Sequence, residues 1–496
     1  MREPAPRGVP STLEPPHETL RVWFHAAVDL ALAHVASLPD QPARGAAPTP
    51  DELRALLEPM PEEPHDPRPL LERVVREWVP RSFTTAGPGY LAYVPGGGLP
   101  TAALADLVAG LTNRFVGVWA AAPLLARLEV TALRWLLDEF AFPRTARGVF
   151  TSGGSLANLV ALACAREKLL GERFQDGVLY GSDQLHHSVP KAARLLGFPR
   201  ARMRLLPSDG ALRLDPERAA AAIAADRTRG LRPAILVANA GTVHTGALDP
   251  LGALADLATR ERLWLHVDGA YGGCFQLAPG GRARLAGIER ADSIAIDPHK
   301  GLFLPYGTGC VLVRDGADLR APHVHESAYL PPVPEDSEAQ DFAEHSPELS
   351  REFRGLRVWL SLKTFGARAF REALAEKLDL AARAEAAIRA VEGLEVVAPT
   401  DLSIVTFRVA PPAGADDAAG EGERLTRALL ERINARQRVF LSGTLVRGRF
   451  AIRICVLSFR THAERLDEGL SHVREETARL LAERAAGSHP AAGPPR

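Results

Sequence analysis

Lys300 stands out chemically because lysine is scarce in this sequence. Lysine occurs only five times, at positions 168, 191, 300, 363 and 377, while arginine fills most other basic positions. Arginine neither deprotonates nor forms an imine with an aldehyde, so chemistry that needs a primary amine has few candidates. Lys300 follows the apolar run SIAID, and burial there favours the neutral, nucleophilic form of an amine. We expect the other four lysines, on helical or amphipathic stretches, to be solvated charges.

Three further motifs carry groups that complement such an amine. WLHVDGAYGG places Asp268 at the end of an apolar strand, where a buried carboxylate needs a cation or strong donors as partners. In TSGGSLANLVAL a strand ends and a helix begins, so the amides of Gly154 and Ser155 are suited to hold a phosphate. In DQLHHS, His186 follows a strand, and its imidazole could stack on a planar ring or transfer a proton.

Each motif alone also has an ordinary interpretation. The glycine turn could be a simple helix cap, Asp268 a structural aspartate, and His186 one of a surface pair in which His187 is an equal candidate. Together, a phosphate cradle, a stacking imidazole, a carboxylate for a ring nitrogen and a Schiff-base lysine are the groups that bind pyridoxal 5′-phosphate (PLP). The sequence therefore predicts a PLP enzyme in which Lys300 carries the cofactor.

The elements that must position these residues form an α/β pattern. Between residues 81 and 360, short apolar runs alternate with helical stretches, which predicts a large domain with a mostly parallel sheet. The expected strands begin near residues 148, 177, 234, 263, 293 and 309. The candidate residues follow these strands, at the sheet edge where open α/β sheets bind ligands.

The flanking regions differ from this pattern. Residues 361–485 are helix-rich with the strand-like runs LEVVAPT, SIVTFRVA and FAIRICVLS, which predicts a smaller α+β domain. Residues 1–80 predict short helices, with a capping box at 49–52, that pack on the main body or on a second subunit. We expect about the first sixteen residues and the tail 486–496 to be disordered.

Composition excludes several classes of protein. The chain has 496 residues and a formal net charge of -1, which argues against a nucleic-acid binder with a general basic field. No apolar run reaches the roughly 20 residues that cross a bilayer, and the N-terminus has no apolar signal core. The four cysteines form no CxxC and are expected to be reduced thiols. We expect a cytoplasmic protein.

The motifs resemble those of the group II PLP-dependent amino-acid decarboxylases, a family that includes the aromatic-L-amino-acid and glutamate decarboxylases. The resemblance extends from about residue 75 to 475, with HVDGAYGG and DPHK as its most specific parts. Further matches are PGYLAYVP, TSGGSLANLVAL, DQLHHS, NAGTVHTGALDP and ELSREFRGLRVW. The resemblance implies the PLP-dependent transferase fold type I, like that of aspartate aminotransferase, and decarboxylation of an L-amino acid.

The resemblance also implies a role for each matching residue. Lys300 would form the Schiff base, Asp268 would bind the pyridine nitrogen, and His186 rather than His187 would stack on the ring. The full set of expected cofactor-binding residues is Lys300, Asp268, Ala270, His186, Gly154, Ser155, Thr242 and His299. Tyr329, in the expected mobile loop HESAYLPP, matches a tyrosine that protonates the substrate Cα. That loop usually reaches the neighbouring subunit's site, which implies a homodimer.

Substrate identity is predicted less directly. Tyr90, Tyr93 and Trp119 could line an apolar pocket, with Arg354 as a further candidate, so we expect an aromatic or bulky apolar amino acid. An acidic amino acid is the alternative, and would need an arginine in the pocket. Gly301 and Gly96 stand where many family members have larger or polar residues, which predicts a different and more open pocket.

Three other functions compete with amine formation. An aldehyde synthase that couples decarboxylation to deamination is one, although such enzymes commonly carry Phe at the position of Tyr329. A catalytically idle protein with the PLP fold is the second. A metal site at His323, His325 and Glu326 is the third, but these residues lie in the expected mobile loop without a further cluster of ligands. We expect no bound metal.

Overall fold

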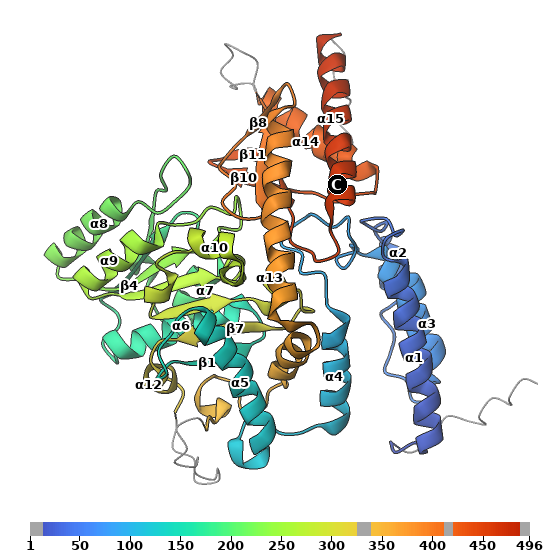
Figure 1. Cartoon of the computed structure of the whole chain (residues 1–496), viewed down its shortest axis with the longest axis horizontal. Coiled ribbons are helices and arrows are strands. Elements are labelled where there is room, and N and C mark those ends of the chain that lie inside the picture. Colours follow the sequence, from blue (N-terminus) through green and yellow to red (C-terminus); the bar gives the residue numbers. More distant parts are fainter. Residues whose placement is uncertain (1–12, 325–338, 411–419, 487–496) are drawn as a thin grey trace, which may run out of the picture.

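The computed structural model describes residues 13–324, 339–410 and 420–486 (Figure 1). Its fold is built around a seven-stranded sheet. The strand order is β1-β7-β6-β5-β4-β2-β3. Strands β3, β2, β4, β5 and β6 run parallel, whereas β7 is antiparallel to both β1 and β6. The strands are β1 (Arg147–Thr151), β2 (Gly177–Ser182), β3 (Met203–Leu206), β4 (Arg232–Asn239), β5 (Trp264–Gly269), β6 (Ser293–Ile296) and β7 (Gly309–Val313).

Helices cover both faces of this sheet. Every residue of β2, β5 and β6 is buried, which explains why these strands are continuously apolar rather than alternating. The covering helix α6 (Gly154–Leu169) contacts β1 and β4 to β7. The other helices around the sheet are α5 (Pro123–Glu139), α7 (Ser188–Leu195), α8 (Pro216–Thr228), α9 (Leu251–Glu261), α10 (Pro279–Arg284), α11 (Pro298–Gly301) and α12 (Gly316–Arg320).

A second, antiparallel sheet lies towards the C-terminal end of the chain. Its order is β10-β11-β9-β8, formed by β8 (Leu394–Val396), β9 (Ile404–Val409), β10 (Ser442–Val446) and β11 (Arg449–Cys455). Helices α14 (Glu421–Ala435) and α15 (Ala463–Ala485) pack against each other, and α14 also packs on this sheet. The three strands expected in this region are present, and β10 is an additional edge strand.

The long helix α13 (Arg354–Arg389) connects the two sheets. It is bent at Gly366, whose φ of 73° lies in the left-handed region that glycine adopts readily. Lys377 on this helix is fully buried, where its Nζ donates to Thr461 O at 2.6 Å and to Glu376 at 2.7 Å. The expectation that all lysines other than Lys300 are solvated is therefore wrong for Lys377.

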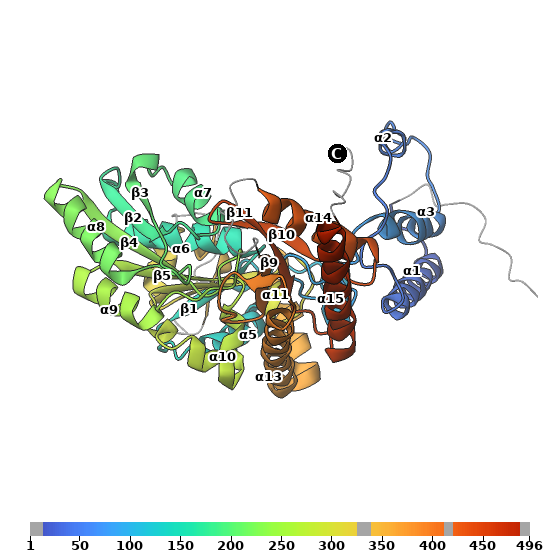
Figure 2. The same cartoon turned by 90° about the horizontal axis from the view of Figure 1, so that it is seen from above.

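The N-terminal helices gather at the end of the molecule opposite α8 and α9 (Figure 2). They are α1 (His17–Ser37), α2 (Pro50–Arg54) and α3 (Pro67–Arg73), followed by α4 (Pro100–Thr112). The expected capping box is present, since Thr49 and Glu52 exchange hydrogen bonds. No residue of α1, α2 or α3 is buried. Within the described ranges, no helix is long and apolar enough to cross a membrane.

Candidate active site

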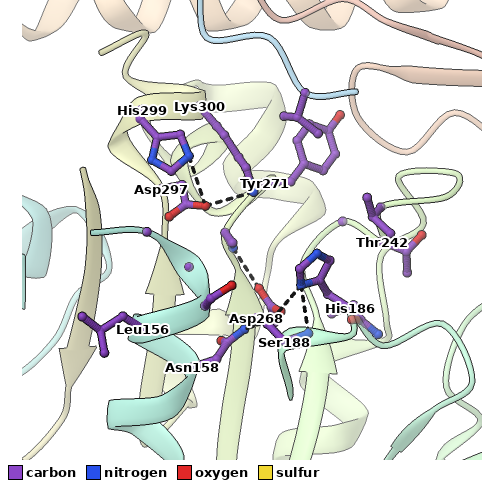
Figure 3. Close-up of a pocket in the computed structure, with 18 of the residues that line it drawn as sticks. Leu156, Asn158, His186, Ser188, Thr242, Asp268, Tyr271, Asp297, His299 and Lys300 are labelled. Atoms are coloured by element: carbon purple, nitrogen blue, oxygen red, sulfur yellow. Dashed lines mark hydrogen bonds and ion pairs between the residues drawn. The ribbon is translucent and has the colours of Figure 1, made fainter. Parts of the chain in front are cut away.

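A pocket of about 320 Å³ opens where the central parallel strands end (Figure 3). The ends of β4 and β5 bring Asn239 and Asp268 into register, and α6 and α11 begin beside them. This is the edge at which parallel α/β sheets place ligands, because the loops after neighbouring strands diverge there. The polar residues that line the pocket include Gly154, Asn158, His186, Ser188, Asp268, Asp297, His299 and Lys300.

Lys300 lies one turn after β6, on the short helix α11, and extends into the pocket (Figure 3). Its Nζ is 2.9 Å from Asp297 Oδ2. Asp297 is almost fully buried, and its Oδ1 has no hydrogen-bond partner among the described residues. His299 Nδ1 lies 2.8 Å from the carbonyl of Thr308, so it must donate there, and Nε2 can donate to a ligand only when the ring is protonated. Burial lowers the pKa of His299.

Asp268 is held at the end of β5 by two donors. Its Oδ1 accepts from the amide of Ala270 at 3.1 Å, and its Oδ2 accepts from Asn158 Nδ2 at 2.9 Å. Both carboxyl oxygens therefore have a hydrogen-bond donor although the side chain is buried. A carboxyl group in the lining of the pocket is suited to pair with a protonated ring nitrogen.

His186 follows β2 and lines the same pocket. Its Nδ1 lies 2.6 Å from Ser188 Oγ and 3.3 Å from the Ser188 amide. Burial lowers the pKa of His186 below its ordinary value of 6.5, Asp268 opposes this shift, and Lys300 adds to it. The imidazole is therefore neutral at neutral pH, which suits a group that stacks on a ring or transfers a proton.

The start of α6 has the shape of an anion cradle. A Cβ added to Gly154 would lie 2.8 Å from Ala270 Cβ and 3.0 Å from Asp297 Oδ2, so only glycine fits there. Glycine therefore lets the start of α6 pack closely against Ala270 and Asp297. The first amides of this 16-residue helix, which have no partner within the helix, lie in the lining of the pocket. Ser155 lines the pocket beside these amides.

The structure brings all eight predicted cofactor-binding residues to this pocket, including Thr242 and Ala270. Thr242 Oγ1 accepts from the amide of Ala247 at 3.1 Å, so its hydroxyl is engaged in its own turn. Tyr329, together with His325 and Glu326 of the metal alternative, lies outside the described residues.

The four predicted substrate-pocket residues do not line this cavity. Tyr90 and Tyr93 stack at 6.5 Å in an aromatic cluster next to Val94, which does line it. Trp119 packs under the guanidinium of Arg127, 5.1 Å from the ring centroid. Arg354 is buried and forms two hydrogen bonds to Glu348, at 2.8 and 3.0 Å. The structure therefore places Arg354 and Trp119 away from the pocket.

The two glycines expected to open the pocket have another explanation. A Cβ on Gly301 would lie 2.3 Å from Cys274 Cβ, so a side chain there would enter the protein core rather than the pocket. A Cβ on Gly96 would lie 2.0 Å from the carbonyl oxygen of His299. Gly96 thus allows the chain at 96 to approach the backbone of the lysine loop. Neither glycine lines the pocket, and a more open pocket stays a prediction.

Several residues of the site were missed by sequence reasoning. Asn158 and Ser188 bind Asp268 and His186, and Asp297 pairs with Lys300. Asp297 had a detectable signal, because it lies in the DPHK motif three residues before the lysine. Asn158 had a weaker one, as a polar residue within the apolar run that follows the glycine turn.

Fold and site together define a PLP-dependent enzyme of fold type I. The pocket offers an amine, an acidic partner for a ring nitrogen, an imidazole that can stack on a ring and a helix N-terminus that can hold a phosphate. When bound, PLP supplies an electron sink for the pair left at Cα as a bond to it breaks.

Comparisons with known proteins identify the family. The pyridoxal-dependent decarboxylase conserved domain matches residues 50–410, so the chain belongs to this family and is a PLP-dependent amino-acid decarboxylase. It is 37% identical over 475 residues to an aromatic-L-amino-acid decarboxylase of Bacillus atrophaeus, covering 95% of this chain and 97% of the relative.

Solved structures agree with this assignment. A structure of Oryza sativa TDC with PLP and tryptamine matches with a TM-score of 0.89 and 30% identity, covering 95% of this chain and 100% of that one. A Rhodiola rosea 4-hydroxyphenylacetaldehyde synthase matches with a TM-score of 0.84 and 26% identity, covering 94% and 99%. The fold and the cofactor predicted from the sequence are confirmed.

Proposed function

We propose that this enzyme decarboxylates an aromatic L-amino acid to the corresponding amine and CO₂. The observation that carries the proposal is the convergence of Lys300, Asp268 and His186 on one pocket at the end of the parallel strands. The resemblance to an aromatic-L-amino-acid decarboxylase over nearly the whole chain supports an aromatic substrate.

The proposed roles follow from the contacts of each side chain. Lys300 would hold PLP through its amine. Asp268 would keep the ring nitrogen protonated, and His186 and Ala270 would contact the ring. The N-terminus of α6, at Gly154 and Ser155, would hold the phosphate with His299 beside it, and Thr242 would lie near the ring.

Two side chains of the protein would supply the proton that the substrate Cα takes up. When bound, PLP would accept the electron pair that the broken Cα–carboxylate bond leaves behind. Tyr329 would donate a proton to Cα of the substrate, with His186 as a second donor through Nε2. The neutral imidazole of His186 is consistent with such a role, because burial lowers its pKa.

An acidic substrate is less well supported by the pocket. Within the described residues, no arginine lines the cavity. The buried Arg453 nearby donates to the carbonyls of Tyr93 and His244, at 3.3 and 3.1 Å, rather than into the pocket. A second substrate carboxylate would therefore lack a cationic partner in this part of the site.

We further propose that the enzyme works as a cytoplasmic homodimer, in which residues 1–80 pack against the partner and residues 81–360 and 361–485 form the large and small domains. Helices α1 to α3 contain no buried residue, although they carry large apolar side chains such as Leu53 and Leu71. On α4, Leu104, Val108 and Leu111 form an exposed apolar stripe. Exposed apolar surfaces of this kind mark association sites. The four cysteines are free, as expected in a reducing compartment.

The test combines a substrate panel with trapping of the Schiff base. Purified enzyme loaded with PLP is given each protein amino acid and dihydroxyphenylalanine, and CO₂, amine and aldehyde are measured. Borohydride reduction should fix PLP on the Lys300 peptide of the wild type, and Lys300→Ala should lose both the adduct and CO₂ release. Exposed Lys363 is the matched control, since Lys363→Ala should retain both.

Each of the following results would contradict one part of the proposed function. An adduct on another lysine, or turnover by Lys300→Ala, would refute the role of Lys300. Release of CO₂ only from glutamate or aspartate would refute the aromatic substrate. Aldehyde formed with consumption of O₂ would favour the aldehyde synthase, and bound PLP without any CO₂ release would favour the idle protein.

A further inference from the structure

The side chain of Asn158, on the first turns of α6, connects three groups behind the pocket. Its Nδ2 lies 2.9 Å from Asp268 Oδ2 and 2.9 Å from Ser188 Oγ. Its Oδ1 lies 2.9 Å from His266 Nε2. The side chains of Asn158 and His266 are fully buried, so these contacts are made without competition from water.

The chain of hydrogen bonds continues beyond His266 into the sheet. His266 Nδ1 lies 2.9 Å from Ser293 Oγ, and Ser293 Oγ accepts from Trp264 Nε1 at 2.8 Å. The two strands β5 and β6 supply these three residues, so the chain is anchored in the rigid centre of the fold.

The direction of each bond follows from the groups at its ends. The carboxylate of Asp268 only accepts, so the amide nitrogen of Asn158 must face it and the amide oxygen must face His266. His266 Nε2 therefore carries the ring proton, and Nδ1 accepts from the hydroxyl of Ser293. Burial lowers the pKa of His266 to about 4, which keeps the ring neutral. Every donor points towards Asp268, and aligned hydrogen bonds strengthen one another.

The second amide proton of Asn158 sets the state of His186. Because Ser188 Oγ accepts from Asn158, its own proton is free to point at His186 Nδ1, 2.6 Å away. The amide of Ser188 also donates to Nδ1, at 3.3 Å. With two donors aimed at Nδ1, the neutral imidazole must carry its proton on Nε2 (Figure 3).

We propose that Asn158 is a positioning residue that fixes the orientation of the Asp268 carboxyl group and the Nε2–H tautomer of His186 at the same time. Asparagine offers two donors and one acceptor at the end of a short side chain, and all three are used here. The inference rests on the proposed roles of Asp268 and His186, and deepens them by naming the group that couples them.

The test uses PLP binding to the apoenzyme, measured by fluorescence titration and by the circular dichroism of the bound cofactor. Asn158→Leu has a similar volume but no polar atoms, and should weaken PLP binding roughly ten- to a hundredfold, the effect of losing one hydrogen bond to a charged group. Asn434 exchanges two hydrogen bonds with the backbone of Leu441 in the small sheet region. The matched variant Asn434→Leu should leave PLP affinity within about threefold of wild type.

Asn158→Asp separates hydrogen bonding from packing, because its shape is unchanged. A carboxyl can donate only when protonated, so the PLP dissociation constant of this variant relative to wild type should rise as pH rises. In an Asp268→Ala background, Asn158→Leu should add little, because Asn158 acts through that carboxylate.

Three results would overturn the inference. The first is a wild-type PLP affinity for Asn158→Asp at every pH. The second is an equal loss of PLP affinity in Asn158→Leu and Asn434→Leu. The third is that the losses of PLP affinity caused by Asn158→Leu and Asp268→Ala add fully in the double variant. These failures are distinguishable from failure of the proposed function. If the wild type forms the Lys300 adduct and releases CO₂ while Asn158→Leu binds PLP normally, only the role of Asn158 is refuted.

Discussion

Glu129→Gln tests how strongly a buried ion pair supports the cofactor site. Glu129 and Arg351 are both completely buried, and Glu129 Oε1 accepts from Arg351 Nη1 at 2.6 Å. Arg351 also donates to the carbonyl of Phe150 at 3.0 Å, at the end of the strand that leads into the Gly154 turn. Glutamine keeps the shape and one acceptor but leaves the guanidinium without a counter-charge. Breaking a buried pair in this way costs about 3–5 kcal/mol.

The assay is urea unfolding followed through the circular dichroism of bound PLP, together with PLP affinity in buffer. We expect the urea midpoint of unfolding to fall markedly. We also expect PLP binding to weaken, because Arg351 without its carboxylate partner would hold the carbonyl of Phe150 and the turn after it less firmly. The double variant Glu129→Leu, Arg351→Met removes both charges and should recover at least half of the loss. A single-variant change below about 1 kcal/mol would refute the reasoning, since it would mean that water or another group compensates the charge.

Three further predictions concern the cofactor, pH and product. Gly154→Val should weaken PLP binding at least tenfold by titration, because its Cβ would meet Ala270 Cβ at 2.8 Å. Burial lowers the pKa values of His266 and His345 to about 4. Below pH 6.5 the unfolded chain therefore binds more protons than the folded chain. The free energy of unfolding, measured by denaturant titration, should fall by a few kcal/mol as pH drops from 6.5 towards 4. Tyr329→Phe should divert product from amine to aldehyde, measured by chromatography, and unchanged amine yield would contradict the assigned proton donor.

The central strands and the residues at their ends could be predicted from the sequence because burial on both faces leaves an unmistakable apolar pattern. The edge strands β3 and β10 could not, since they are short, only partly buried and interrupted by polar residues. Their pairing is decided by neighbours far along the chain, which local patterns do not contain.

The positions of Lys377 and Arg354 show a second reason why some features could not be predicted from the sequence. Lys377 looks like a solvated helix residue, but the carbonyl of Thr461 meets it inside the protein. Arg354 matches the family pattern, yet Glu348 holds it away from the pocket. In both cases the deciding partner is a group brought near by tertiary structure. The position of Lys300 in the pocket could be predicted because its own motif contains Asp297, the residue that it contacts there.

The bent helix α13 belongs to both hydrophobic cores. Phe370, Leu374 and Leu378 pack in the core of the large sheet, and Leu380 and Ile388 pack in that of the small sheet. Because α13 packs in both cores, it cannot leave one core without disturbing the packing of the other. The regions built on the large sheet and on the small sheet should therefore unfold in a single cooperative transition. A fragment of the chain that ends within α13 should fail to fold.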